Sequence, residues 1–207
     1  TLAGAHSVAP IAARATTATV NQANAQNSQI VGYSIYSAGL VAEAEGTRVT
    51  NATTSEGQTI NPTVTQGGNG TAMVSGGVAA KTSSSMDDTT DPNSINNRVR
   101  RFFGLAPRKT QVEVPTVIEN CYVQYSSNGQ TQNVGGLVGF AENTQLSNSY
   151  VYGQIKASDL VGSLAAMVGD DVQFDHCYYH DATGNQIFGY DGNGNSASNT
   201  SSFKGSA

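Results

Sequence analysis

The segments VGGLVGF at residues 134–140 and LSNSYV at 146–151 form a short unit that occurs again further along the chain. The second copy consists of VGSLAAM at 161–167 and FDHCYY at 174–179, and a copy of the second half alone, IENCYV, lies at 118–123. The copies follow one another at a period of about 28 residues, which is typical of proteins that stack one supersecondary unit on the next.

Each half of the unit is short, rich in Val, Leu, Tyr and Phe, and bounded by Gly, Asn, Asp and Ser. This pattern predicts strands and turns, because a helix needs a longer run with a period of about 3.6 residues. One such unit cannot bury its apolar face alone, whereas stacked copies shield one another and pair their equivalent strands in parallel, about 4.8 Å apart. We therefore predict an all-β fold, a right-handed parallel β-solenoid (β-helix) of five to six coils.

Stacking of the copies places equivalent residues in columns that run along the solenoid. Two columns are apolar, one is polar and can form hydrogen bonds between neighbouring Asn side chains, and one is aromatic. The glycines Gly135, Gly136 and Gly139 suit sharp corners, where φ is positive or the backbone is closely packed. The predicted columns are Ile118, Leu146 and Phe174; Leu137 and Leu164; Asn120, Asn148 and His176; and Tyr122, Tyr150 and Tyr178.

The two segments of the first copy, together with IENCY at 118–122, resemble the GLUG repeat of secreted and surface proteins of bacteria and archaea. Proteins with this repeat include adhesins and immunoglobulin-A-cleaving metallopeptidases. The resemblance covers residues 117–180 and implies an adhesin-like surface β-solenoid in which the repeats are not catalytic. In the second copy, Ser163, Ala166 and His176 replace the Gly, Gly and Asn of the repeat.

Weaker copies extend the pattern towards the N-terminus, as far as residues 34–60. Apolar anchors at intervals of about 27 to 33 residues predict five coils, and residues 1–33 are expected to be either a cap or a degenerate first coil. We expect the solenoid to span residues 34–190 and a polar tail, flexible or extended, to span 191–207. The predicted anchors are Leu40, Met73, Leu105, Leu137 and Leu164.

A polar, acidic and Pro-containing stretch near residues 83–100 interrupts the pattern and predicts a loop that projects from the solenoid. Half of the ten basic residues of the chain lie in this stretch or just after it. They form either a solvated loop that pairs with nearby carboxylates or a contact patch for an anionic partner or a neighbouring subunit. The residues concerned are Arg98, Arg100, Arg101, Arg108 and Lys109, with Asp87, Asp88 and Asp91 as possible partners.

The composition limits the class of protein. Charged residues make up only 12% of the chain, Trp is absent, and the net charge is −5 with a pI near 5.0. An acidic chain lacks the basic face that nucleic-acid binding requires, and no apolar run is long enough to span a membrane. We therefore expect no nucleic-acid partner and no membrane insertion. The first residue is Thr1 rather than Met, so we expect a processed mature form or a fragment.

The two cysteines, Cys121 and Cys177, occupy equivalent positions two units apart, with Ser149 between them. Two coil spacings amount to roughly 9.6 Å, which exceeds the Cα separation of about 7 Å that a disulfide can bridge. We therefore predict two unpaired thiols that are buried or half-buried.

Residues at the start of the predicted tail alternate as in a calcium-binding loop, at Asp191, Asn193 and Asn195. Ser196 and Ser202 stand where the EF-hand pattern needs Gly and Glu. A turn or linker therefore explains this segment better than a calcium site.

A second group of possible metal ligands consists of His176, Cys177 and His180, with Asp175 and Asp181 beside them. Each could bind zinc. On one extended strand, however, His176 and His180 would lie about 13 Å apart, too far for a single ion without a turn. We expect these residues to fill columns of the solenoid, and we expect no metal and no cofactor.

Clustered carboxylates are the remaining enzymatic possibility, because many β-solenoids cleave polysaccharides with Asp or Glu in a groove. Asp170, Asp171 and Asp175 form the nearest such cluster, but they also occur where a polar turn is expected. Three N-glycosylation sequons, which chance also explains in a chain rich in Asn and Thr, begin at Asn51, Asn69 and Asn199.

These observations predict a non-catalytic extracellular module, structural or adhesive, displayed at the cell surface and able to bind a glycan or protein ligand. The alternative is a self-assembling subunit of an extracellular fibre, sheath or surface layer, in which copies join by β-augmentation. A second alternative is a polysaccharide lyase or hydrolase built on a β-helix.

Overall fold

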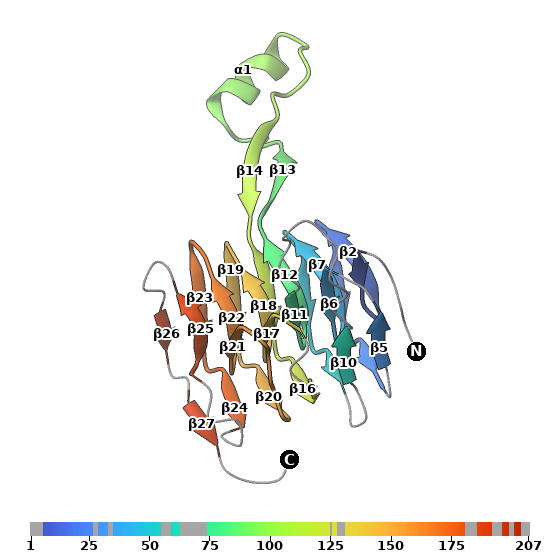
Figure 1. Cartoon of the computed structure of the whole chain (residues 1–207). Helices are drawn as coiled ribbons and strands as arrows, with labels where there is room; N and C mark the ends of the chain where they lie inside the picture. Colours follow the sequence, from blue (N-terminus) through green and yellow to red (C-terminus); the bar gives the residue numbers. More distant parts are fainter. Residues whose placement is uncertain are drawn as a thin grey trace.

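The protein is almost entirely β-structure (Figure 1). The computed structural model describes residues 6–26, 29–32, 35–54, 59–62, 74–124, 126–127, 131–180, 186–191, 196–198 and 201–203. These ranges contain 27 strands and one α-helix. Strands of successive coils lie side by side in the body, and a single arm stands away from it.

Parallel sheets form the walls of the body, and each sheet takes at most one strand from each coil. The first sheet has five strands, β1 (Ser7–Val8), β6 (Tyr36–Ala38), β11 (Val74–Gly76), β17 (Asn133–Gly135) and β21 (Leu160–Gly162). The second sheet has six strands, β2 (Ala12–Thr16), β7 (Val41–Glu45), β12 (Ala79–Ser83), β18 (Val138–Ala141), β22 (Ala165–Val168) and β25 (Phe188–Asp191).

Two further six-stranded sheets complete each coil. The third sheet contains β3 (Thr19–Asn21), β8 (Arg48–Thr50), β15 (Thr116–Glu119), β19 (Thr144–Ser147), β23 (Val172–Asp175) and β26 (Ser196–Ser198). The fourth contains β4 (Asn24–Ala25), β9 (Thr53–Thr54), β16 (Tyr122–Gln124), β20 (Tyr150–Tyr152), β24 (Tyr178–His180) and β27 (Ser201–Phe203). A separate parallel pair is formed by β5 (Gln29–Gly32) and β10 (Thr59–Pro62).

Six coils follow from this arrangement, because three of the sheets contain six strands in coil order. The predicted parallel β-solenoid of five to six coils is therefore confirmed. The first coil runs from β1 to β4, within residues 1–33. At the other end, β26 and β27 pair in parallel with β23 and β24 of the fifth coil, so strands within residues 191–207 belong to the sixth coil.

The anchor series predicted from the spacing was wrong at Leu105, which lies in the arm and is exposed. In the third coil, Val78 takes the position equivalent to Leu40 and Leu137, because the Val78 amide donates to the Leu137 carbonyl at 2.8 Å and the Val41 amide donates to that of Val78 at 3.0 Å. Met73, the other predicted anchor in this part of the chain, lies outside the described residues.

The predicted stacking of Leu137 on Leu164 is confirmed, since the Leu137 amide donates to the Leu164 carbonyl at 2.8 Å and both side chains are fully buried. The column of Ile118, Leu146 and Phe174 is confirmed as well, with register pairs between neighbouring coils and side chains at most 1% exposed. The aromatic column forms at Tyr122, Tyr150 and Tyr178, and the first two rings stack with their centroids 4.8 Å apart.

The residues of the predicted polar column lie at a corner of the solenoid, where the chain changes direction. Asn120, Asn148 and His176 all adopt left-handed backbone conformations, with φ of 53°, 47° and 50°, and Asn51 continues the column with φ of 53°. Asn tolerates this region better than most residues, because its short side chain can form local hydrogen bonds. Asn120 Nδ2 donates to Asn51 Oδ1 at 3.4 Å, as expected for stacked Asn side chains.

The glycines of the first copy serve close packing rather than positive φ. None of Gly135, Gly136 and Gly139 has a φ in the left-handed region. A Cβ added to Gly136 would lie 1.9 Å from the carbonyl oxygen of Ser163 in the next coil. The absence of a side chain is therefore what lets the backbones of neighbouring coils approach each other here.

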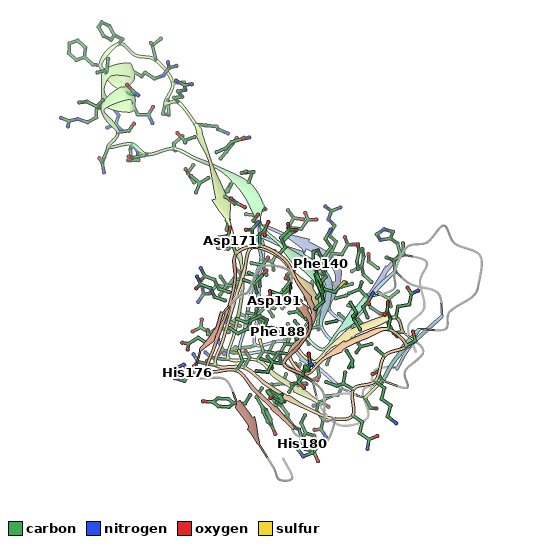
Figure 2. The ribbon with its side chains drawn as sticks, turned by 60° about the vertical axis from the view of Figure 1, so that its left-hand side comes forward. Phe140, Asp171, His176, His180, Phe188 and Asp191 are labelled. Atoms are coloured by element: carbon green, nitrogen blue, oxygen red, sulfur yellow. The ribbon has the colours of Figure 1, made fainter. Side chains whose placement is uncertain are left out.

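The interruption expected near residues 83–100 is larger and more ordered than a loop. Strands β13 (Ser85–Thr89) and β14 (Thr110–Val114) form an antiparallel hairpin, and the helix α1 (Ile95–Phe102) lies at its end. We call residues 85–114 the arm and residues 94–109 its tip. The arm is the part that stands away from the body in Figure 1 and Figure 2.

The stacked columns predict a test of the solenoid core. Leu146→Ala removes a side chain that is 1% exposed, and should lower the free energy of unfolding by about 2–5 kcal/mol because a cavity remains. Gln145→Ala, on the adjacent exposed position of the same strand, should change it by less than about 0.5 kcal/mol. Urea unfolding followed by circular dichroism measures both values. Equal losses in the two variants would contradict the assignment of the core face.

Candidate functional site

The arm collects most of the large apolar side chains that the described chain exposes. Phe102 is 85% exposed and Ile95 is 76% exposed. Ile95, Val99 and Phe102 share one face of α1, because they follow one another at helical spacing. The exposed set in the arm is Met86, Ile95, Val99, Phe102, Phe103, Leu105 and Val112, and the corresponding set in the body is Ile11, Tyr178 and Tyr190.

The tip is also the most basic part of the chain. It contains Arg98, Arg100, Arg101, Arg108 and Lys109 and no Asp or Glu. The predicted pairing with nearby carboxylates is found for one cation, since Lys109 Nζ lies 3.3 Å from Asp88 Oδ2 with both side chains exposed. Within the described chain, none of the four arginines forms an ion pair.

Local hydrogen bonds fold the tip. Ser94 caps α1, because its Oγ accepts from the Asn97 amide at 3.2 Å. Asn97 is 5% exposed, donates from Nδ2 to the carbonyl of Asp91 at 2.8 Å, and accepts the Arg108 amide at 2.7 Å. These bonds tie the start of the helix to the returning chain, so the helix needs no apolar core to hold it.

Two of the arginines contact the backbone of the arm. Arg100 Nε donates to the carbonyl of Ala106 at 2.7 Å, and Arg101 donates to that of Pro92 at 3.4 Å. Both lie in the last turn of α1, where a positive charge interacts favourably with the helix dipole.

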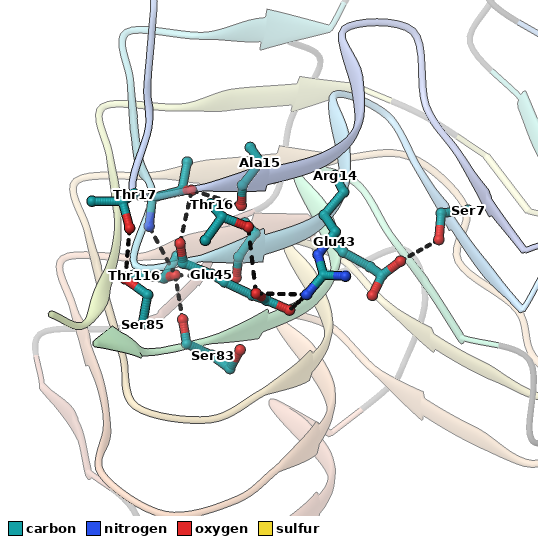
Figure 3. Close-up of polar contacts among 12 residues, drawn as sticks. Ser7, Arg14, Ala15, Thr16, Thr17, Glu43, Glu45, Ser83, Ser85 and Thr116 are labelled. Carbon is teal, nitrogen blue, oxygen red and sulfur yellow. Dashed lines mark hydrogen bonds and ion pairs between the residues drawn. The ribbon is translucent and has the colours of Figure 1, made fainter. Parts of the chain in front are cut away.

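The root of the arm is fixed to the body by a buried threonine (Figure 3). Thr116 Oγ1 donates to the carbonyls of Ser83 at 2.7 Å and Ala44 at 3.1 Å. Ser85 lies directly over Gly46, where an added Cβ would come within 1.9 Å of the Ser85 hydroxyl oxygen. Both ends of the insertion are thus held against the preceding coil, which fixes where the arm leaves the solenoid.

A shallow groove with a volume of about 220 Å³ lies at the root of the arm. Glu113 Oε1 accepts from the Ser84 hydroxyl at 2.5 Å, and Asn143 Nδ2 donates to the same hydroxyl oxygen at 3.3 Å. The amide side chains of Asn143, Gln145 and Gln173 line the groove and can hydrogen-bond to hydroxyl-rich ligands. Its lining residues are Ser84, Glu113, Pro115, Asn143, Gln145, Asp171 and Gln173.

The predicted carboxylate cluster is only partly assembled. Asp171 lines the groove from a corner with φ of 52°, whereas Asp170 and Asp175 are not among the lining residues. Asp175 Oδ1 instead lies 3.0 Å from Nδ1 of His176 at a different corner. The second carboxylate of the groove is Glu113, which sequence reasoning missed because the arm brings it there from far along the chain.

The candidate zinc ligands serve other purposes in the structure. His176 occupies the polar corner, while the His180 ring packs 4.5 Å from that of Tyr152, and Figure 2 places the two histidines apart. Within the described ranges, no group of three His, Cys, Asp or Glu side chains is placed to hold a metal ion. The remaining candidates fall outside the described residues, namely Asp181, Asn193, Asn195 and the sequons at Asn69 and Asn199. Asn51, which begins the other sequon, is exposed.

Both cysteines are free and buried, as predicted. Cys121 lies opposite Ser149 in the next coil, because the Cys121 amide donates to the Ser149 hydroxyl at 3.1 Å. Burial raises the pKa of each thiol from 9.0 to about 11. Such thiols stay protonated at neutral pH, which makes them poor nucleophiles and poor metal ligands.

Comparison of the chain with protein-family models, with curated proteins and with solved structures finds no match. Among the described residues, no helix is both long and apolar enough to cross a membrane. The resemblance to the GLUG repeat therefore stays a prediction that rests on the sequence alone.

The raised thiol pKa values predict a loss of stability at alkaline pH. Because the folded state holds the thiol protons more tightly than the unfolded chain, the contribution of the neutral thiols is complete below pH 9 and is lost as the pH rises towards 11. Urea unfolding at several pH values should show this decline in the wild type. The double variant Cys121→Ala, Cys177→Ala should show a smaller decline, whereas Ser149→Ala, in the same column, should keep the full one. A decline of equal size in all three proteins would contradict the prediction.

Proposed function

We propose that the protein is a non-catalytic extracellular module in which a structural solenoid displays an adhesive arm at the cell surface. One observation carries this proposal, namely that the arm leaves the middle of a regular stack and holds seven of the ten exposed large apolar side chains of the described protein. Exposed apolar side chains gathered at one place are typical of an interaction site.

The body supports the role of a scaffold. Its coils are joined by parallel hydrogen-bonded strands from β2 to β25, and the arm interrupts only the third of them. Each coil is held by its neighbours, so the arm does not have to contribute to the stability of the stack. The polar groove at the root of the arm offers amides to a glycan or to a protein ligand.

The groove bears on the enzymatic alternative. Asp171 and Glu113 are the two carboxylates that line it, and the Ser84 hydroxyl is a hydrogen-bond partner of Glu113. Asp170 and Asp175, the other members of the predicted carboxylate cluster, do not line it. A polysaccharide-cleaving enzyme would therefore have to use Asp171 and Glu113 as its pair of carboxylates, whereas the adhesive proposal rests on the arm.

Removal of the arm tests the proposal. Because Ser85 pairs with Val114, residues 86–113 can be replaced by Asn-Gly, which closes a two-residue hairpin. The shortened protein should keep the β-sheet signal in circular dichroism and the unfolding midpoint of the wild type. It should lose the binding that the wild type shows on a glycan array or on immobilised extracellular matrix proteins. Equal binding by both proteins would contradict an adhesive arm, and cleavage of a polysaccharide that Asp171→Asn abolishes would show an enzyme instead.

A fibre subunit is the second candidate, and the open ends of the sheets favour it. In the part of the chain that the structure describes, β3 and β26 are the outer strands at opposite edges of the third sheet. Unpaired strand edges can join to those of another copy. Because the two edges differ, such contacts would be heterologous and would produce filaments rather than closed dimers.

Electron microscopy over a range of concentrations tests this candidate. Filaments should lengthen with concentration if copies join end to end. Lysines placed on the edge strand, Thr19→Lys with Asn21→Lys, should suppress them because charge blunts an exposed edge. Gln145→Lys, on the exposed face of a central strand, should leave them unchanged. A monodisperse protein at every concentration would exclude the fibre.

A further inference from the structure

The apolar face of α1 has no partner within the described protein. Ile95, Val99, Phe102 and Phe103 are all more than half exposed. The rings of Phe102 and Phe103 contact each other edge to face, with centroids 5.3 Å apart, and both still face solvent. Leaving two phenylalanines in water at the end of an arm is unfavourable unless something covers them in the working state.

Cations flank this apolar face. A hollow of about 290 Å³ on the helix is lined by Arg98, Arg101 and Phe102. Two guanidinium groups beside an aromatic ring form a binding surface that suits a negatively charged group above an apolar layer. Neither Arg98 nor Arg101 has a carboxylate partner in the described chain. The tip is therefore free to pair with an external anion.

A second copy of the chain fits this surface poorly. Contact between two tips would bring two sets of five cations together, and like charges oppose such a contact. Contact between a tip and a neighbouring body would match the charges, but the described body exposes only the scattered Ile11, Tyr178 and Tyr190. No patch there could cover Ile95, Val99 and Phe102 together.

The distribution of charge and the shape of the protein both favour a flat anionic surface as the partner of the tip. Four of the 15 acidic and five of the ten basic residues lie in the arm, which leaves 11 acidic and five basic residues in the rest of the chain. Figure 1 shows α1 at the far end of the arm. An anionic surface would thus attract the tip and repel the body, and the hairpin holds the two apart.

We propose that the tip of the arm is an interfacial anchor that binds bilayers containing anionic lipids. Phe102 and Phe103 enter the boundary between headgroups and acyl chains, and Arg98 and Arg101 bind the lipid phosphates. Short helices with apolar aromatic residues on one face and arginines beside them bind membrane interfaces in this way. This binding rests on the role proposed above for the arm as the contact site, and it names anionic lipid as what the tip contacts.

The sequence predicts no segment that spans a membrane. Binding at the membrane interface does not need a spanning segment. The helix α1 has eight residues, so it is roughly 12 Å long, well short of the about 30 Å of a hydrocarbon core. It can only lie in the interface. A single small anchor of this kind gives weak, reversible binding that several copies on one surface would reinforce.

Co-sedimentation of the full chain with vesicles tests the proposal. The wild type should bind vesicles of phosphatidylcholine mixed with phosphatidylglycerol and should not bind phosphatidylcholine alone. Arg98→Gln with Arg101→Gln should weaken binding roughly 30-fold, since each basic residue near an anionic surface contributes about 1 kcal/mol and about 1.4 kcal/mol corresponds to a factor of ten. Arg14→Gln with Arg48→Gln removes two exposed body arginines and should leave binding unchanged.

One double variant tests the two phenylalanines, and a second double variant serves as its control. Phe102→Ser with Phe103→Ser should abolish binding to the mixed vesicles while leaving the unfolding midpoint unchanged, because both side chains are exposed. Ile11→Ser with Tyr190→Ser replaces two exposed apolar residues of the body and should have no effect on binding. Binding that survives the loss of both phenylalanines would overturn the proposal.

Tryptophan fluorescence distinguishes a lipid partner from a free anion and from a second copy of the chain. Because the chain has no Trp, Phe102→Trp supplies a single reporter, whose emission should shift to shorter wavelength when mixed vesicles are added. Tyr190→Trp should show no shift. A shift caused by inorganic phosphate alone would overturn the proposal, because a free anion would then suffice. A shift that grows with protein concentration without vesicles would overturn it in favour of a second copy.

Discussion

The parallel backbone ladder between successive coils is the interaction on which the rest of the structure depends. It sets the register that places Leu146 between Ile118 and Phe174, so that each apolar side chain is covered from two sides. The ladder also explains why the corners must be uniform. Left-handed residues recur at the same position, from Asn51 to His176, because every coil has to turn at the same point to meet its neighbour. A ladder of this kind stabilises polar strands as well, which accounts for β26 and β27 in a segment rich in Ser and Asn.

The ladder also explains how one coil carries a long insertion. After the arm, Val117 pairs with Arg48 of the coil before and with Gln145 of the coil after. The register therefore resumes on both sides as if nothing had been inserted. Thr116 makes this possible, because its hydroxyl bonds to carbonyls of Ser83 and Ala44 at the point where the chain returns. An insertion at a corner needs only its two ends to be fixed, and its middle is then unconstrained by the solenoid.

Sequence reasoning succeeded where the copies are similar and failed where an insertion shifted the period. The columns predicted within residues 118–180 are correct, because chemically similar residues recur there at nearly constant spacing. Leu105 was misassigned as an anchor because its spacing fitted the series by chance, and Val78, the true occupant, is a smaller residue in a weaker copy. The helix α1 was missed although Ser94 and the spacing of Ile95, Val99 and Phe102 indicate one. The groove could not be foreseen, since Glu113 reaches Asp171 only through the arm.

The separation of arm and body has a physical reason. A solenoid is stable when each coil buries its apolar face against the next, so an apolar patch on its wall would compete with correct stacking and invite aggregation. The arm escapes this conflict, because Asn97 and the hairpin hold the tip by hydrogen bonds and not by an apolar core. Its phenylalanines can then face outwards without weakening the stack. Changes at the tip should consequently alter what the protein binds without altering whether it folds, which is the condition under which a repeat scaffold can carry a contact site.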